Sequence, residues 1–95
     1  MALSYTVVYA EVVVQEDIPK LPKTIRQRIK LAIETKIMTQ PDLFGKPLRR
    51  SLHGYRKLRV GDYRVVFRIE KKVVKIFAIQ HRRMVYETAD KRLSH

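Results

Sequence analysis

Six side chains in the second half of the chain are of the types needed to bind and cleave a phosphodiester. They are Lys57, Arg59, Arg64, His81, Arg82 and Tyr86, and all but the tyrosine can carry positive charge. Cations on a rigid surface can bind a phosphodiester and stabilise the charge that develops on it, which is often the largest contribution to catalysis. Lys57 can serve as a base, since neighbouring cations disfavour the charged form of a lysine. The set fits RNA cleavage by the strand's own 2′-hydroxyl group, which needs no metal.

Some of these side chains also have a plainer structural interpretation. Phe77 and Tyr86 offer flat surfaces on which a base can stack. Phe77 is equally compatible with burial under the C-terminal tail, and Tyr86 with anchoring that tail. His81 fits a structural or solvated imidazole as well as a proton donor. The sequence leaves these alternatives open.

Residues 55–68 predict the β-hairpin that would position three of the cations. The pair Gly61-Asp62 lies between two alternating runs and is a two-residue turn signal, because glycine adopts positive φ without strain. This turn places Arg59 opposite Arg64. Because side chains alternate along a strand, one face of the hairpin is an apolar core face. That face holds Leu58, Val60, Tyr63, Val65, Phe67 and Ile69, and the other holds Lys57, Arg59, Arg64 and Arg68, with Val66 among them.

The direct opposition of Arg59 and Arg64 favours an anionic partner. Like charges paired across two strands destabilise a sheet, here by about 1 kcal/mol or less in a water-like medium. A surface selected for solubility alone would mix charges of both signs. The second face of the hairpin is therefore predicted to bind a polyanion.

The composition agrees with this prediction and excludes several other classes of protein. The chain has 95 residues, enough for one domain spanning residues 1–95, and its 21 Lys and Arg against 9 Asp and Glu give a net charge of +12. Such an excess points to nucleic acid or an acidic protein as partner. The chain has no cysteine, no metal-ligand spacing and no run near the ~20 apolar residues of a spanning helix. We expect a cytoplasmic protein without metal, cofactor or membrane contact.

The remaining elements predict an α+β fold. Ser4–Tyr9 alternates as a strand, while residues 10–19 are compatible with strand or helix. Pro22 begins a helix whose apolar stripe is Ile25, Ile29, Ile33 and Ile37. Residues 39–54 are predicted to form a loop. The expected architecture is an N-terminal strand, two helices and a three-stranded antiparallel meander, with the helices on one face of a single twisted sheet and the other face open and basic.

A second turn at Lys71-Lys72 is predicted to return the chain from residue 73 to residue 80. Strict alternation then places Val74, Ile76 and Ala78 on the core face, and Val73, Lys75, Phe77, Ile79 and His81 on the basic face.

The stretch Lys46–Tyr86 resembles the RelE/ParE superfamily of toxins from type II toxin–antitoxin systems. The resemblance lies in Leu52-His53-Gly54, in LRVGDYRVVF at residues 58–67 and in QHRRMVY at residues 80–86. It implies a RelE-like mRNA interferase, an endoribonuclease that cuts mRNA in the ribosomal A site and needs no cofactor. The catalytic residues so implied are Lys57, Arg64, Arg82 and Tyr86. We expect Arg56, Arg59, Arg68, His81 and Arg83 to contact mRNA or ribosomal RNA.

The chain departs from the RelE pattern at two places. Tyr55 stands where RelE has a further lysine, and the interval from Arg82 to Tyr86 is two residues shorter. The resemblance also implies a cognate antitoxin that wraps the toxin with an acidic or amphipathic segment, which the net charge and an exposed Phe77 and Ile79 would suit. The alternatives are a ParE-like inhibitor of DNA gyrase and a non-catalytic RNA-binding relative.

Overall fold

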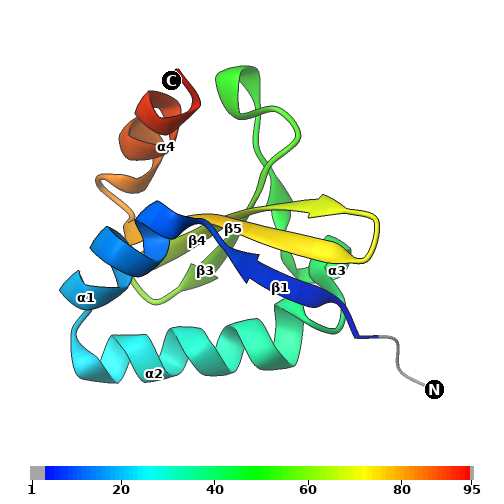
Figure 1. Cartoon of the computed structure of the whole chain (residues 1–95), viewed down its shortest axis with the longest axis horizontal. Coiled ribbons are helices and arrows are strands. Elements are labelled where there is room, and N and C mark those ends of the chain that lie inside the picture. The colour runs from blue at the N-terminus through cyan, green and yellow to red at the C-terminus, as the bar shows by residue number, and fades with distance from the viewer. Residues whose placement is uncertain (1–3, 95) are drawn as a thin grey trace.

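A single five-stranded mixed sheet organises the molecule (Figure 1). The computed structural model describes residues 4–94, and its strand order is β1-β5-β4-β3-β2. Strand β1 (Thr6–Tyr9) lies parallel to β5 (Val73–His81), whereas the other neighbouring strands are antiparallel. The predicted α+β class is confirmed, with the first strand paired to the last.

Both predicted turns are present. Strand β3 (Arg56–Val60) pairs with β4 (Tyr63–Glu70) in the expected register, so Arg59 lies opposite Arg64. Gly61 has a φ of 60°, in the left-handed region that glycine tolerates. At the second turn a lysine has this conformation, since the φ of Lys71 is 57°.

Two helical segments follow β1. Residues 10–19, which the sequence left open, are mostly helical: the π-helical turn η1 (Val13–Asp17) continues into α1 (Ile18–Lys20). Helix α2 (Lys23–Ala32) begins after Pro22 and continues into a second π-helical turn, η2 (Ile33–Ile37). The predicted stripe faces inward, with Ile29, Ile33 and Ile37 buried. Four residues make slightly more than one turn of an α-helix, so a stripe of every fourth residue drifts around the helix. The wider π-helical turn counteracts this drift.

The predicted loop at residues 39–54 contains short regular elements, so the prediction of a loop throughout was wrong. These elements are α3 (Pro41–Phe44), β2 (Lys46–Pro47) and the 3-10 turn η3 (Arg50–Leu52). Strand β2 extends the sheet because Lys46 pairs with Lys57. Gly45 lies so close to the Phe67 ring that a Cβ atom would overlap it, which explains a glycine between α3 and β2.

The main core lies between one sheet face and the helices α1 and α2 (Figure 1). The buried side chains of that core are Val13, Leu21, Ile29, Ile33, Ile37, Leu58, Val60, Val65, Phe67, Val74, Ile76 and Ile79. All the hairpin residues predicted for the core face belong to this cluster or pack against it, including Tyr63 and Ile69.

The second face of the sheet is not open, contrary to the prediction. Helix α4 (Val85–Leu93) lies on the opposite side of the sheet from α2 (Figure 1). Val66, Ala78 and Val85 are fully buried there, and Leu48, Tyr55, Phe77 and Tyr86 pack around them. An exposed apolar patch of this kind needs cover, which α4 supplies, while cations of the same face such as Arg68 and Lys75 stay accessible.

A β-bulge in β5 corrects the predicted facing of its second half. Val66 pairs with Ala78 whereas Phe67 pairs with Ile76, so Phe77 is an extra residue. Ala78 therefore joins the second face, and Ile79 returns to the main core at 1% exposure. His81 lies opposite Tyr63 on the core side, with ring centroids 5.4 Å apart. The predictions that put Ala78 in the core and Ile79 and His81 on the basic face were wrong.

Within residues 4–94, no helix is both long and apolar enough to cross a membrane, and no group of three or more His, Asp or Glu side chains could hold a metal ion.

Candidate active site

The turn at Gly61-Asp62 anchors two of the four predicted catalytic residues. The Nη1 atom of Arg64, on β4, donates hydrogen bonds of 2.9 Å to the carbonyls of both Gly61 and Tyr63. The backbone N–H of Arg82, just after β5, donates to the Asp62 carbonyl at 2.8 Å, and its Nε lies 4.0 Å from an Asp62 carboxylate oxygen. Both arginines are thus fixed at the same end of the sheet.

The other two predicted catalytic residues contact each other. The Nζ atom of Lys57, on β3, lies 5.5 Å from the centre of the Tyr86 ring, on α4. An ammonium at this distance over an aromatic face is attracted to it. Tyr86 also packs against the buried cluster under α4, so it both anchors that helix and faces Lys57.

A groove of about 330 Å³ follows the edge of β3, and we call it the β3-edge groove. Five of its lining residues are cations: Lys36, Lys46, Lys57, Arg59 and Arg64. Phe44 and Leu58 complete the lining, which includes no carboxylate from the part of the chain that the structure describes. Focused positive charge of this kind attracts polyanions.

Three of the predicted RNA-binding arginines lie outside this groove. Arg68 is paired with Glu70 at 3.0 Å, and its guanidinium lies 5.9 Å from the Tyr55 ring centre. Arg56 lies on the main-core face, opposite Phe67, and its Nη1 donates to the carbonyls of Gly45 at 2.7 Å and Asp42 at 3.2 Å. Arg83 is exposed beyond β5.

His81 is also separated from the cationic groove. It lies beside Tyr63, and its Nδ1 atom accepts a hydrogen bond of 3.2 Å from the backbone N–H of Arg83. Its place on the core side favours the structural alternative over contact with a substrate bound on the second face.

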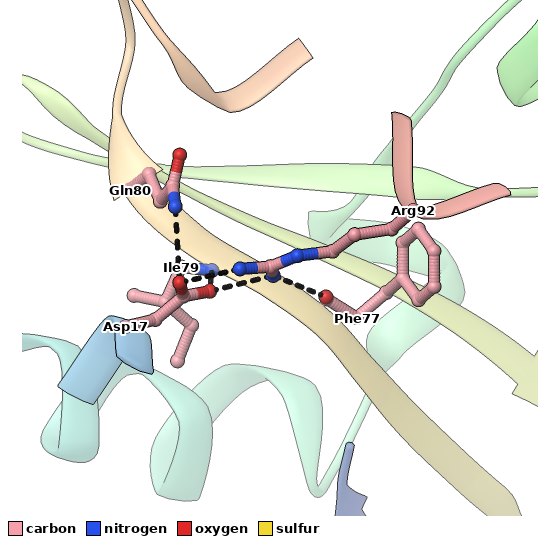
Figure 2. A network of polar contacts seen from close by, with 5 residues as sticks. All are labelled: Asp17, Phe77, Ile79, Gln80 and Arg92. Atoms are coloured by element: carbon pink, nitrogen blue, oxygen red, sulfur yellow. Dashed lines mark hydrogen bonds and ion pairs between the residues drawn. The ribbon is translucent and has the colours of Figure 1, made fainter. Parts of the chain in front are cut away.

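A buried ion pair that the sequence analysis missed ties α4 to the edge of β5 (Figure 2). The Asp17 carboxylate, at the end of η1, accepts hydrogen bonds of 2.8 and 2.9 Å from Arg92. It also accepts hydrogen bonds from the Ile79 backbone N–H at 2.9 Å and the Gln80 side-chain amide at 3.0 Å. Arg92 in turn donates to the Phe77 carbonyl at 3.0 Å. Asp17 and Arg92 therefore provide hydrogen-bond partners for backbone groups of β5 in the part of that strand that extends past its pairing with β1.

Burial raises the pKa of Asp17, but the hydrogen bonds from Arg92, Ile79 and Gln80 outweigh it, so the pKa lies below the ordinary value. The carboxylate stays ionised although Asp17 is only 2% exposed. One sequence signal could have revealed it: Val13, Asp17 and Leu21 recur every four residues, and a carboxylate on an apolar stripe needs a partner.

The fold and the site together define a small basic α+β domain with a cationic groove along a sheet edge. Residues 7–86 match the family model described as the ParE toxin of type II toxin–antitoxin system, parDE. The chain is 35% identical over 74 residues to toxin RelG of Mycobacterium tuberculosis, covering 76% of this chain and 85% of RelG. It is 37% identical over 54 residues to toxin RelE of the same organism, an alignment that covers 57% of this chain and 56% of that toxin.

Solved structures agree with these matches. The toxin–antitoxin complex RelBE2 of Mycobacterium tuberculosis superposes with a TM-score of 0.77 at 32% identity, over 83% of this chain and 92% of the other. The RelB–RelE complex of Methanococcus jannaschii gives a TM-score of 0.66 at 28% identity, over 84% and 95%. A mutant of E. coli toxin RelE in the free state shares the fold, with a TM-score of 0.72 at 22% identity, over 94% and 97%. The chain belongs to the RelE/ParE superfamily of toxins from type II toxin–antitoxin systems.

Proposed function

We propose that this toxin is a ribosome-dependent endoribonuclease that cuts mRNA in the A site and so inhibits translation in the cytoplasm. The observation that carries the proposal is the β3-edge groove, where Lys57 and Arg64 lie among five cations and no carboxylate. Its relatives RelE and RelG, together with the four residues of the RelE pattern, support the same activity.

The proposed chemistry uses only groups of the protein and the RNA, together with water. Lys57 takes the proton of a 2′-hydroxyl, whose oxygen attacks the adjacent phosphorus as the bond to the 5′-oxygen breaks. Arg64 stabilises the negative charge on the phosphoryl oxygens. Arg82 stabilises the departing 5′-oxygen, and Tyr86 positions Lys57 through their contact. The departing 5′-oxygen takes up a proton from water as Lys57 returns its own proton to the solvent, so the products are a 2′,3′-cyclic phosphate and a 5′-hydroxyl.

We also propose a cognate antitoxin with an acidic or amphipathic segment as protein partner. The relatives RelBE2 and RelB–RelE are described as toxin–antitoxin complexes. A net charge of +12 favours an acidic partner. Ile79 was expected to be exposed and to aid this contact. It is buried instead, so it contributes nothing to the docking surface.

A ParE-like inhibitor of DNA gyrase is the second candidate, because the matching family model is that of the ParE toxin. One pair of assays separates the two. The nuclease proposal predicts cleaved mRNA with 5′-hydroxyl ends only when programmed ribosomes are present, and unaffected supercoiling by gyrase. Intact mRNA together with inhibited supercoiling would refute it in favour of the gyrase inhibitor. Gel shifts without cleaved ends would assign a binding module.

A further inference from the structure

We infer that Phe44, Lys36 and Lys46 form a subsite for one unpaired nucleotide of a single-stranded RNA, beside the catalytic groups. The inference rests on the proposed function, since Lys57 and Arg64 line the same groove. In this subsite Phe44 stacks on a base, while Lys36 and Lys46 contact phosphates on either side of it.

Phe44 is the phenylalanine that is free to stack. It is 39% exposed, whereas Phe67 is fully buried and Phe77 packs against Tyr55 with ring centroids 5.0 Å apart. The Nζ atom of Lys36 lies 5.7 Å from the centre of the Phe44 ring. An aromatic face beside a flexible ammonium is the arrangement by which single-stranded nucleic acid is held without base-pair readout.

The segment that carries Phe44 and Lys46 is held in place from two sides. Gly45, which separates them, packs directly on the Phe67 ring. Arg56 donates to the carbonyls of Asp42 and Gly45, so this arginine also holds the wall of the groove in position. A wall fixed before binding reduces the entropy that a ligand must lose.

The charges continue beyond the groove along the same edge. A neighbouring groove of about 270 Å³ shares Lys36 and Arg59 and adds Arg28, also without a carboxylate in its lining. A volume of about 330 Å³ lies at the small end of ligand sites and suits one nucleotide. An amphipathic peptide helix would require a continuous apolar strip, but among residues 4–94 only Phe44 and Leu58 are apolar in the lining of the β3-edge groove. These features favour RNA over a protein segment.

The test is the affinity of the full chain for a fluorescein-labelled, unstructured single-stranded RNA, measured by anisotropy. Phe44→Ala should weaken binding roughly 5- to 150-fold, the range for loss of one stacked base. Phe44→Leu should lose as much affinity, because leucine is apolar but has no flat face on which a base can stack. Phe44→Tyr should retain the wild-type affinity. Leu43→Ala is the matched control, because Leu43 is 67% exposed on the same short helix outside the groove.

Salt dependence tests the two lysines. Each phosphate contact to a single strand contributes about −0.7 to the slope of log affinity against log salt. Lys36→Gln and Lys46→Gln should each make the slope less steep by about that amount. Lys23→Gln, an exposed lysine at the start of α2, should leave it unchanged.

The outcomes separate this inference from the proposed function. Ribosome-dependent cleavage by wild type, with equal RNA affinity in Phe44→Ala and Leu43→Ala, overturns the subsite and leaves the nuclease. Subsite-dependent RNA binding without cleavage supports the subsite and removes the nuclease. Loss of affinity in Phe44→Ala for a glutamate-rich amphipathic peptide, with RNA affinity unchanged, overturns the subsite in favour of a protein partner.

Discussion

Replacing Arg92 by methionine should remove much of the free energy of unfolding. Methionine keeps the helix propensity of α4, but the buried Asp17 carboxylate loses two hydrogen bonds and its compensating charge. Breaking a buried ion pair from one side costs about 3–5 kcal/mol. A domain of 95 residues has a total stability of roughly 5–14 kcal/mol. At about 4–8 °C per kcal/mol, the Tm should fall by roughly 12–40 °C.

The assay is equilibrium urea unfolding followed by circular dichroism, with two comparison variants. Lys91→Met removes an exposed neighbouring cation on α4 and should cost less than about 0.5 kcal/mol. The double variant Asp17→Leu/Arg92→Met leaves no buried charge, although the buried Ile79 N–H loses its acceptor, at about 1–3 kcal/mol, and the partly buried Gln80 amide loses one as well. It should therefore be more stable than Arg92→Met alone. Equal stability of Arg92→Met and Lys91→Met would refute the reasoning.

Three further predictions concern pH, packing and turn strain. The pKa of Asp17 is lower in the folded state than in the unfolded state. The carboxylate therefore contributes its full stabilisation of the fold above the unfolded-state pKa of about 3.9, and this stabilisation is lost as the pH falls through the folded-state pKa. Stability should therefore fall more steeply with acid in wild type than in Asp17→Leu/Arg92→Met, and equal slopes from pH 5 to 3 would contradict this. Gly45→Ala should cost about 1–3 kcal/mol in urea unfolding, because the buried Phe67 must move; an unchanged midpoint would disprove the close packing. Lys71→Gly should stabilise the fold by about 0.5–1 kcal/mol by relieving a positive φ, and a lower Tm would count against that strain.

Features set by neighbouring residues were predictable from the sequence. The turn at Gly61-Asp62 depends on a local preference of glycine, and the register of β3 against β4 then follows from counting. The facing of Lys57, Arg59 and Arg64 is a consequence of that count. Local chemistry therefore predicted the part of the sheet that carries most of the candidate site.

The β-bulge at Phe77 defeated the same counting one strand later. Strict alternation would have placed Ala78 in the main core and the larger Ile79 on the second face, whereas in the structure Ala78 is buried on the second face and Ile79 in the main core. The bulge is favoured because it buries Ile79 in the main core while Phe77 and Ala78 fill the patch under α4. A small residue at a position expected in the core, next to a large apolar residue at a position expected to be exposed, is a usable sequence signal of a bulge.

Contacts between distant segments could not be predicted from the sequence. Asp17 and Arg92 are 75 residues apart, and their pairing depends on η1 and α4 meeting at one edge of β5. Lys36, Phe44 and Lys46 come from three consecutive elements, and the pairing of β2 with β3 brings them beside Lys57. Each element had recognisable residues, but the tertiary fold alone brings them together.

The rate of mRNA cleavage on programmed ribosomes by Arg64→Ala tests the central claim most directly. The hydrogen bonds of its side chain go to carbonyls of the turn, so the variant should remain folded. Removing the group that stabilises charge on the phosphate should lower the single-turnover rate about 100- to 1,000-fold. Lys23→Ala, a charge-matched substitution outside the β3-edge groove, should cleave at the wild-type rate. Equal rates for Arg64→Ala and Lys23→Ala would contradict catalysis at this cationic site.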